Sequence, residues 1–360
     1  MADVRRHDWQ PYPREWINAD SPIVEDQAFT IMTYNILCDV VALHNPGYKY
    51  VRDGFLKMED RHPLIVAEVK QRCPDVLCLQ EVENNNLSER LIPDLKREGY
   101  VCASDHTGYK EGPATFYRPE RFSLEWFARR VAHDAFMELL QDSNSLSDEI
   151  TAAVREYLER PKEFILTKLK CKKSGWLVTV ANIHTTWEDL EWPTVQTAQV
   201  CAGLRKLLEL SGGSDSCYVY TGDFNSLPSC PPYCFLRDGR LSPEVLAKYP
   251  DKKLVALDNG EVFSLPEVVP HLFCHNEPLK NAYLVVKGRN PEATNCDPLS
   301  LTDDPVFIGC LDYIWYNSKT IGCSGVVDTP PQRLLKEEVG LPSTNFPSDH
   351  IYLMAKLHFL

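Results

Sequence analysis

Polar side chains follow several apolar segments of the chain, at the point where each segment ends. Asn35, Glu81, His184 and Asp223 each come directly after a run with the composition of a β-strand, and Asn225 follows two residues later. Carboxylates are ligands that hard divalent cations prefer, an acid can serve as a general base, and His and Asn can hold phosphate oxygens. These residue types therefore predict a metal-dependent hydrolytic site at one rim of a sheet.

The C-terminal part of the chain adds residues of the same kinds. Asp349 and His350 stand directly before an apolar run, and Asp312 lies at the start of another. Each residue alone has an ordinary explanation, because an Asp or Asn at a strand end is most often a turn residue or a helix cap. Glu81 likewise fits a solvated loop, and His184 a buried core histidine. Turn residues have no reason to assemble the full inventory of a hydrolytic metal site, so we expect the set to act together.

The elements that must position these residues are visible as apolar, β-branched and aromatic runs. We expect strands over Phe29–Leu37, Asp75–Val82, Ala114–Tyr117, Phe164–Cys171, Trp176–His184, Cys217–Gly222, Leu311–Asn317 and Ile351–Phe359. A turn at Lys173–Gly175 joins two of them into a hairpin. Pro193 starts one helix, which ends at Gly212, and Ser147 caps another. Many strands mixed with helices predict an α+β fold, in which two packed sheets carry helices on their outer faces.

Composition limits the class of ligand. The chain has 360 residues, with 51 acidic and 38 basic side chains and a net charge of −13. Proteins that bind nucleic acid by charge alone are strongly basic, so the balance argues against a grip on long RNA through a basic stripe. The chain shows no internal repeat or Gly/Ser linker, and we expect an N-terminal extension over residues 1–28 and a single catalytic domain over residues 29–360.

The cysteines and the apolar runs bear on the compartment. No run approaches the length of a membrane span, and the first residues have no apolar core of a secretory signal. The 13 cysteines are an odd number without a framework spacing, which favours reduced thiols in a cytoplasmic protein. A nuclear location is the alternative, and a mitochondrial one applies only if a presequence is missing. A loose cluster, comprising Cys230, Cys234, His271, Cys274 and His275, has ligands for zinc, but its spacing favours free thiols.

Six sequence blocks in order carry a resemblance to a known family. They are TYNIL at Asn35, LCLQEVE at Glu81, ANIH at His184, GDFNSLP at Asp223, GCLDYIWY at Asp312 and PSDH at His350. The chain from about Phe29 onward resembles the endonuclease/exonuclease/phosphatase (deoxyribonuclease I-like) superfamily. It is most similar to the deadenylase branch, which includes the carbon catabolite repressor nucleases, nocturnin, the Angel proteins and the 2′,5′-phosphodiesterase. The string EGPATFYRPERFSL looks closest to the last of these.

The resemblance implies a four-layer α/β/β/α sandwich and a role for each residue. Mg²⁺, with Mn²⁺ as an alternative, is expected at Glu81, Asn35 and Asp349. The expected catalytic residues are Asp223 as the general base, Asn225 and His184 on the phosphate, His350 with its partner Asp312, and Asn35. Phe307, Asn225 and His184 are the expected substrate-binding residues, Phe307 by stacking on a terminal base.

The implied function is a Mg²⁺-dependent phosphodiesterase or exoribonuclease that removes nucleotides, preferably AMP, from the 3′ or 2′ end of poly(A) RNA or 2′,5′-linked oligoadenylate. A phosphatase acting on a nucleotide 2′-phosphate or an RNA 2′,3′-cyclic phosphate is the alternative. Deadenylases carry Thr-Asn-Tyr-Thr six residues before this aromatic. Here Thr294–Asn295–Cys296 precedes Phe307 with a longer, acidic insertion that contains Asp297, Asp303 and Asp304. The expected partner is an RNA end, an oligoadenylate or a small nucleotide, bound by a monomer without membrane contact or a leucine-rich docking module.

Overall fold

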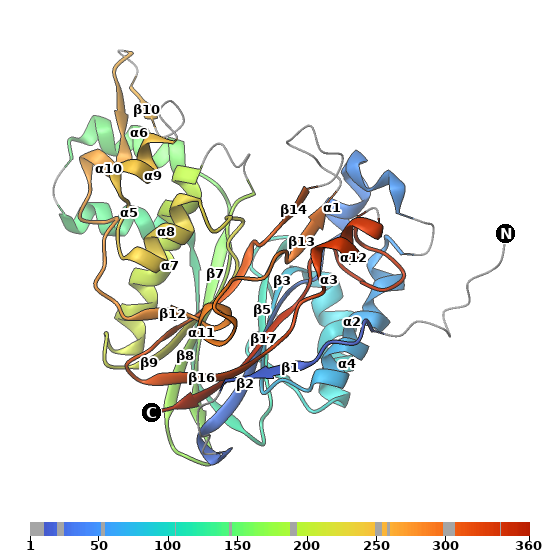
Figure 1. The fold of residues 1–360 in the computed structure, drawn as a ribbon. Helices are drawn as coiled ribbons and strands as arrows, with labels where there is room; N and C mark the ends of the chain where they lie inside the picture. Colours follow the sequence, from blue (N-terminus) through green and yellow to red (C-terminus); the bar gives the residue numbers. More distant parts are fainter. Residues whose placement is uncertain are drawn as a thin grey trace.

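The computed structural model describes residues 11–19, 25–51, 55–104, 106–143, 146–187, 193–248, 254–257, 260–297, 307–338 and 340–360. Within them, two mixed sheets form the centre of the molecule (Figure 1). The first has seven strands in the order β1 (Trp16–Asn18), β16 (Ile321–Val327), β17 (Leu353–Phe359), β2 (Ala28–Asn35), β3 (Val76–Glu83), β5 (Glu111–Tyr117) and β4 (Val101–Cys102). The second has six, in the order β12 (Leu279–Asn281), β15 (Asp312–Asn317), β9 (Cys217–Asp223), β8 (Leu177–His184), β7 (Glu163–Cys171) and β6 (Phe122–Val131).

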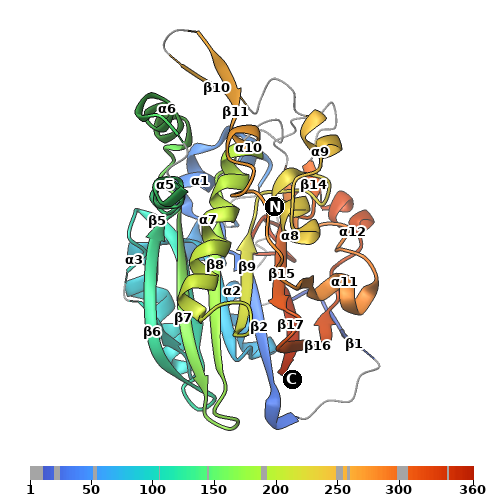
Figure 2. The ribbon, with the colours of Figure 1, turned by 90° about the vertical axis from the view of Figure 1, so that its left-hand side faces the viewer.

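Helices cover the outer faces of both sheets. Those beside the first sheet are α1 (Asp39–His44), η2 (Pro46–Tyr50), α2 (Met58–Arg72), α3 (Asn84–Asn86), η3 (Leu87–Leu91), α4 (Ile92–Arg97) and α12 (Gln332–Glu337). Those beside the second sheet are α5 (Ala132–Ser143), α6 (Asp148–Leu158), α7 (Pro193–Ser211), α8 (Pro231–Asp238), α9 (Pro243–Ala247) and α10 (Leu265–Val268). The helix α11 (Ala282–Lys287) packs against both β15 and β16, at the edge between the sheets. Figure 2 shows α7 lying over the strands of the second sheet, with α5 and α6 near their upper end. Two small hairpins, β10 (Leu254–Ala256) with β11 (Val262–Ser264) and β13 (Asn295–Asp297) with β14 (Phe307–Gly309), complete the chain together with η1 (Glu25–Gln27).

Alternation along the strands explains the layers. Phe29 and Ile31 of β2 point into the cluster between the sheets, whereas Met32 and Tyr34 pack with the helices of the first sheet. Successive side chains of a strand face opposite sides, so one strand supplies two cores. The expected α/β/β/α sandwich is therefore confirmed, with one core between the sheets and one under each helical layer.

The predicted elements are present, with additions that the sequence pattern did not indicate. Each predicted strand is found, and Ser147 accepts a hydrogen bond from the backbone N–H of Ile150 as an N-cap. The elements that were not predicted include the strands β1, β4, β6, β12 and β16 and the helices α2, α4 and α5. The edge strand β6 is half exposed and carries charged residues, which hide its alternation, and β16 contains Gly and Ser in its middle.

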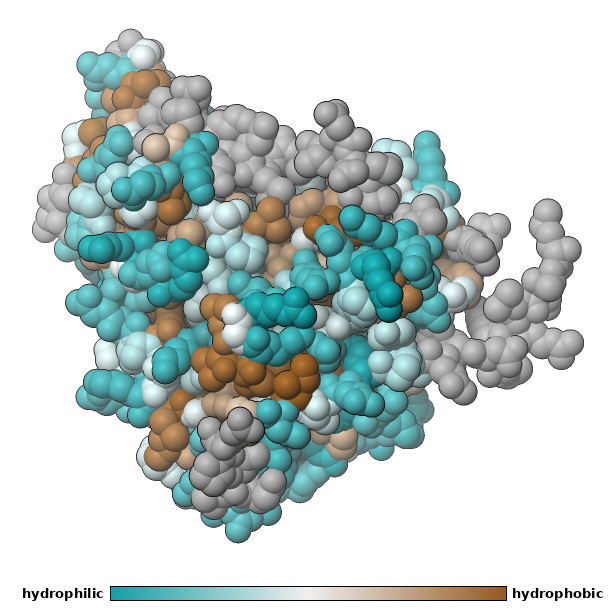
Figure 3. All heavy atoms as spheres, in the orientation of Figure 1, coloured by the Kyte–Doolittle hydropathy of each residue, from teal (hydrophilic) through white to brown (hydrophobic). Residues whose placement is uncertain are grey.

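The surface and the cysteines fit the sequence reading. Figure 3 shows a face that is mostly hydrophilic, with an apolar group of atoms in the region of α11, where Val285 is exposed. All 13 cysteines lie in described segments and are free thiols. In the described part of the chain, none of the helices has the length and apolar character needed to cross a membrane. Asp303 and Asp304, in the acidic insertion, lie outside the described residues.

Candidate active site

The register of the two sheets brings the predicted residues to one rim. Strands β2 and β3 are parallel, so Asn35 stands opposite Gln80 with Glu81 next to it. Strands β8 and β9 are also parallel, and His184 stands opposite Asp223, while the antiparallel β15 places Asp312 opposite Asp223 from the other side. The C-terminal ends of four strands, two from each sheet, therefore meet where the sheets face each other.

A cleft of about 200 Å³ lies at this rim. Six of the predicted residues line it, namely Glu81, His184, Asp223, Asn225, Asp349 and His350. The other lining residues are Val41, Asn45, Tyr48, Glu111, Lys162, Trp187, Asn295, Asp297 and Leu311. Asn35 and Asp312 are almost completely buried and contact the lining residues from behind. The fold therefore brings together eight of the nine predicted site residues.

Phe307 is the ninth, and it is not among the described residues that line the cleft. It starts β14, where its register partner on β13 is Asp297, a residue that does line the cleft. A Cβ atom built on Gly309 would come within 2.7 Å of the Phe307 ring, so the ring lies over that glycine. Trp187, which is 50% exposed, lines the cleft itself together with the buried Tyr48.

Backbone strain is concentrated at the catalytic ends of the strands. Glu81 and Asn225 have positive φ angles, 56° and 45°, in a region that non-glycine residues rarely adopt. Between them, Gly222 has φ 141°, and a Cβ there would lie 2.0 Å from the carbonyl oxygen of Ile183. Such strain persists where the surrounding structure holds it, and it turns these two side chains into the cleft.

Asn35 joins the acids of the two sheets. Its Nδ2 donates to Oε1 of Glu81 and to Oδ2 of Asp223, both at 2.9 Å, while its Oδ1 accepts from the backbone N–H of Leu37. Below it, Nε2 of Gln80 donates to Oδ1 of Asn182 at 2.7 Å. These amide contacts fix the spacing of the two sheets under the cleft.

The acids of the cleft form a donor set that fits a divalent cation. Glu81, Asp223 and Asp349 are buried carboxylates, and Asp349 accepts from the hydroxyl of Tyr48 at 2.7 Å. Several carboxylates taken out of water repel one another unless a cation offsets them, and oxygen ligands are those that hard divalent cations prefer. The cleft is therefore suited to a divalent metal ion.

Asp223, Asp312 and His350 also hold ligand atoms within 4.8 Å of one another. Nδ1 of His350 lies 2.9 Å from Oδ2 of Asp312, and its Nε2 lies 3.5 Å from Oδ2 of Asp223. Because Asp312 already satisfies one ring nitrogen, this trio has the geometry of an oriented imidazole between two acids. Among the buried carboxylates of the cleft, Glu81 and Asp349 could then hold a hard cation.

The two histidines of the cleft carry different charge. Burial lowers the pKa of His350, but Asp312, Asp223 and Asp349 outweigh it, so the pKa lies well above its ordinary value and the ring is a cation. Burial, together with Lys162 and His350, holds the pKa of His184 well below the ordinary range, so that ring is neutral. The cleft therefore offers one charged and one neutral donor.

Asp223 sits between these groups with a pKa suited to proton transfer. Burial is the largest effect and raises the pKa of Asp223 to about 7. Asp312 also raises this pKa, whereas His350 and the hydrogen bonds from Asn35 and Asn225 lower it. A carboxylate that titrates near neutral pH is matched to the work of a general base.

Arg61 is a residue that the sequence analysis missed. It is completely buried on α2 and donates to the backbone carbonyls of Ile36, Leu37, Leu56 and Pro347. Two of these follow Asn35, and Pro347 lies two residues before Asp349. Arg61 thus ties the segment after β2 to the segment before β17. Nothing in the local sequence marks it, because its hydrogen bonds go to backbone carbonyls and its acidic partner Asp39, 3.8 Å away, lies on α1.

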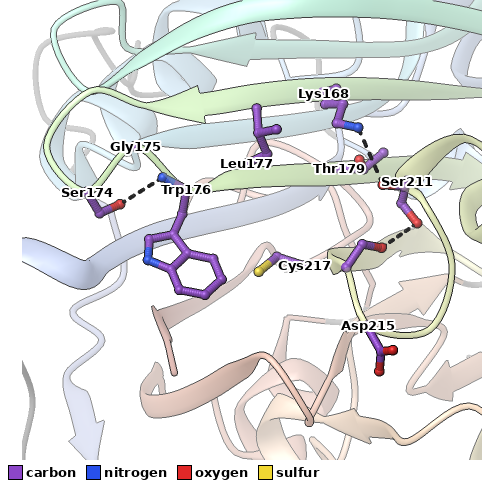
Figure 4. Close-up of a pocket in the computed structure, with 10 residues that line it drawn as sticks. Lys168, Ser174, Gly175, Trp176, Leu177, Thr179, Ser211, Asp215 and Cys217 are labelled. Atoms are coloured by element: carbon purple, nitrogen blue, oxygen red, sulfur yellow. Dashed lines mark hydrogen bonds between the residues drawn. The ribbon is translucent and has the colours of Figure 1, made fainter.

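A second cavity lies at the opposite end of the second sheet (Figure 4). Its volume is about 420 Å³, and its lining includes Lys168, Trp176, Ser211, Asp215 and Cys217. It is larger than the catalytic cleft, but its one acid, Asp215, is exposed and paired with Lys319. The described residues that line this second cavity therefore do not form a buried set of acids and histidines like that of the first cleft.

The loose Cys/His cluster does not assemble into a zinc site among the described residues. Within the described residues, the one group of His, Cys, Asp or Glu side chains close enough to hold a metal ion consists of Asp223, Asp312 and His350. Both ring nitrogens of His275 are already used, by the carbonyl of Phe235 at 2.8 Å and the N–H of Glu277 at 3.2 Å.

The chain is similar to proteins of a known family. The model of the Endonuclease/Exonuclease/phosphatase family matches residues 32–350. Carbon catabolite repressor protein 4 homolog 1 of Arabidopsis thaliana is 27% identical over 348 residues, which cover 91% of this chain and 57% of the relative. The human 2′,5′-phosphodiesterase 12 is 30% identical over 354 residues, which cover 93% of this chain and 52% of the relative. The chain thus spans a little over half the length of these curated relatives.

Two solved structures share the fold. ANGEL2, described as a 2′,3′-cyclic phosphatase and solved in complex with adenosine-2′,3′-vanadate, superposes with a TM-score of 0.74 at 22% identity, covering 97% of this chain and 99% of that one. The human Nocturnin catalytic domain with bound sulfate gives a TM-score of 0.61 at 22% identity, covering 96% and 98%. The family match covers most of the chain and every block of the cleft from Asn35 to His350. The chain belongs to the endonuclease/exonuclease/phosphatase family.

Proposed function

We propose that the protein is a divalent-metal-dependent phosphodiesterase that acts as an exoribonuclease and releases nucleotides, preferably AMP, from the 3′ or 2′ end of an adenylate chain. The observation that carries this proposal is the position of Asp223, which lies within reach of both histidines and is bridged by Asn35 to Glu81. General base, phosphate donors and metal ligands therefore share one cleft.

Each residue has a step that its contacts support. Asp223 takes the proton from the attacking water, since its pKa of about 7 lets it accept a proton at neutral pH. His350 and His184 donate to phosphoryl oxygens as negative charge develops, and Asp312 holds the His350 ring in place. Asn225 is anchored by one N–H on the carbonyl of Thr185 at 2.9 Å, which leaves its second N–H for a phosphate oxygen.

The metal is proposed to be Mg²⁺, with Mn²⁺ as the alternative. Glu81 and Asp349 would hold it, and Asn35 keeps Glu81 in position from behind. When bound, such an ion offsets the charge of the phosphate against that of the acids.

Recognition of the chain end is proposed to rest on short-range contacts, since the net charge of −13 does not favour a long polyanion. Trp187 and Phe307 are the aromatic residues proposed to stack on a terminal base, which contributes about 1 to 3 kcal/mol per base. Trp187 faces the cleft directly, and Phe307 reaches it only by way of the β13–β14 hairpin. We propose a monomer in the cytoplasm, in keeping with its free cysteines.

The curated relatives favour this reaction over the phosphatase alternative. Several are named 3′-5′-exoribonuclease subunits, and one is named a 2′,5′-phosphodiesterase. ANGEL2, which is named a 2′,3′-cyclic phosphatase, is similar at 22% identity, and a likeness at that level supports the fold alone.

The deciding experiment compares product patterns. The purified protein is given 3′,5′-linked and 2′,5′-linked oligoadenylate, an RNA with a 2′,3′-cyclic end and NADPH, with Mg²⁺ or Mn²⁺ and after chelation. We expect stepwise loss of single adenylates that depends on the metal, and a fall of at least about 10³-fold in Asp223→Asn. Release of inorganic phosphate alone would establish the phosphatase, and full activity of Asp223→Asn would refute the assignment of the base.

A further inference from the structure

Lys162 is the one lysine or arginine among the described residues that line the catalytic cleft. It directly precedes β7 and lies on the wall formed by the second sheet. The acids of the same lining are Glu81, Glu111, Asp223, Asp297 and Asp349. A permanent cation among so many acids needs an explanation, because the family resemblance assigned no role to this position.

The partner of Lys162 is Glu111 at the start of β5. Nζ of Lys162 donates to Oε1 of Glu111 at 3.0 Å, and the two side chains are 23% and 24% exposed. An ammonium group has three N–H donors, and within the described residues this is its one hydrogen bond, so two donors are left for a ligand. Oε2 of Glu111 is buried and finds no donor in the described part of the chain. The pair is therefore incompletely satisfied at the edge of the cleft.

The charge of Lys162 is secure at neutral pH. Burial lowers its pKa, but Glu111 and Glu81 outweigh that effect, and the pKa lies above the ordinary value. The same field reaches His184, whose pKa Lys162 helps to lower. The strand order gives the position of Lys162. In the second sheet β8 lies between β7 and β9, and Phe164 of β7 pairs with Ile183, next to His184. Lys162 therefore lies on the His184 side of the cleft, away from Asp312 on β15.

A purely structural ion pair is the simpler explanation. Such a pair usually satisfies both partners when it is taken out of water, because unpaired charged groups are costly. Here both partners keep free hydrogen-bonding capacity, and the ammonium group borders the catalytic cleft. This arrangement is typical of a group that completes its hydrogen bonds with a ligand.

We propose that Lys162 binds the phosphate that flanks the scissile one, and so makes the enzyme prefer substrates with at least two phosphodiester links. The inference rests on the proposed function. The scissile phosphate is assigned to the space between His184 and His350. Lys162 directly precedes β7, the strand on the far side of β8 from β9, and the proposal places the continuing chain of the substrate there. Glu111 positions the ammonium group.

The test measures selectivity with defined oligoadenylates in the linkage that the enzyme prefers. The substrates are the dinucleotide ApA, with one phosphodiester, the trimer ApApA, and a trimer in which the non-terminal phosphate is a neutral methylphosphonate. Initial release of the terminal adenylate gives kcat/KM for each. The variants are Lys162→Met and Lys162→Arg, and the matched control is Lys168→Met, further along the same strand and outside the cleft (Figure 4).

We expect Lys162→Met to lower the preference for the trimer over ApA by about 10- to 100-fold, as for loss of a charge-assisted hydrogen bond. The methylphosphonate should cost the wild-type enzyme a similar factor and cost Lys162→Met almost nothing, while Lys162→Arg and Lys168→Met keep the wild-type preference.

An equal loss on ApA and the trimer would place Lys162 on the scissile phosphate and overturn the inference. Unchanged kcat/KM on both ApA and the trimer would mean that Lys162 and Glu111 are a structural ion pair, and this result would also overturn the inference. If the wild-type protein cleaves none of the three substrates, the proposed function itself fails, which is a different result. Thermal unfolding of each variant confirms that the comparison is made between folded proteins.

Discussion

The two ends of strands β8 and β9 make an instructive comparison. At their C-terminal ends, a cleft of about 200 Å³ holds buried acids and histidines, and at their N-terminal ends, a cavity of about 420 Å³ holds Trp176, Lys168 and serines. Among the described residues that line it, the larger cavity lacks the groups that catalysis needs. What distinguishes the catalytic end is the burial of charges against one another, since desolvation is what moves a pKa toward the working pH.

Two aspartates show the difference directly. Asp223 at the catalytic end is 1% exposed, and burial raises its pKa to about 7. Asp215 at the other end has a side chain 88% exposed, and its hydrogen bond and ion pair with Lys319 hold its pKa below the usual value. One residue type is thus a poised base at one end and a solvated anion at the other.

The largest effect that separates the two ends is expected for Asp312→Asn. The asparagine keeps the shape but cannot hold His350 as a cation through its Nδ1, which lies 2.9 Å from the carboxylate. We expect kcat to fall by about 10³-fold with little change in KM. Steady-state kinetics on the preferred oligoadenylate measure it.

The matched control is Asp215→Asn at the other end, where kcat should stay within about twofold of wild type, because a surface pair contributes little. If the two variants behaved alike, burial of the charge would not be what distinguishes the ends.

Much of the catalytic end could be predicted because its residues sit where a pattern changes. Asn35, Glu81, His184 and Asp223 each end an apolar strand, and a polar residue at that point is visible in the sequence. The parallel pairs β2–β3 and β8–β9 then bring them together. Asn225, Asp312, Asp349 and His350 are visible in the same way beside apolar runs, and the family resemblance added their expected roles.

The residues that escaped prediction act through contacts that no local pattern encodes. Arg61 binds backbone carbonyls far away in the chain, up to Pro347. Lys162 and Glu111 meet across two sheets, 51 positions apart. The edge strand β6 was missed because its exposed face carries charges, so its alternation is weak. Tertiary pairing decides these positions, and spacing alone does not report it.

A buried acid away from both ends tests the claim that burial dominates here. Glu68 of α2 is 4% exposed and accepts from the hydroxyl of Tyr34 at 2.8 Å, and burial raises its pKa from 4.5 to about 7. The folded state then holds a proton that the unfolded chain releases, so stability falls as pH rises from about 4.5 to about 7.

Glu68→Gln removes this titration. We expect its free energy of unfolding, relative to wild type, to rise by about 3 kcal/mol between pH 4.5 and pH 8. Urea unfolding at several pH values measures the difference, and Glu98→Gln, which removes a surface partner of Lys70, should show no such rise. A flat difference for Glu68→Gln would mean that this acid is ionised in the folded state, and that burial alone does not set the charges of the core.

The smallest effect on activity is expected at the other end of the strands, for Trp176→Ala. The indole is 41% exposed and stacks on Phe359, with centroids 5.7 Å apart and planes 9° from parallel (Figure 4 shows the indole at the cavity). Losing an aromatic pair costs about 1 kcal/mol of stability beyond the buried area. We therefore expect slightly weaker resistance to urea, with kcat/KM within about twofold of wild type on every oligoadenylate. A fall of more than about tenfold in kcat/KM, with stability unchanged, would mean that substrate reaches the larger cavity as well. Both ends of the strands would then bind substrate, and burial of charge would mark only the end where the bond is cleaved.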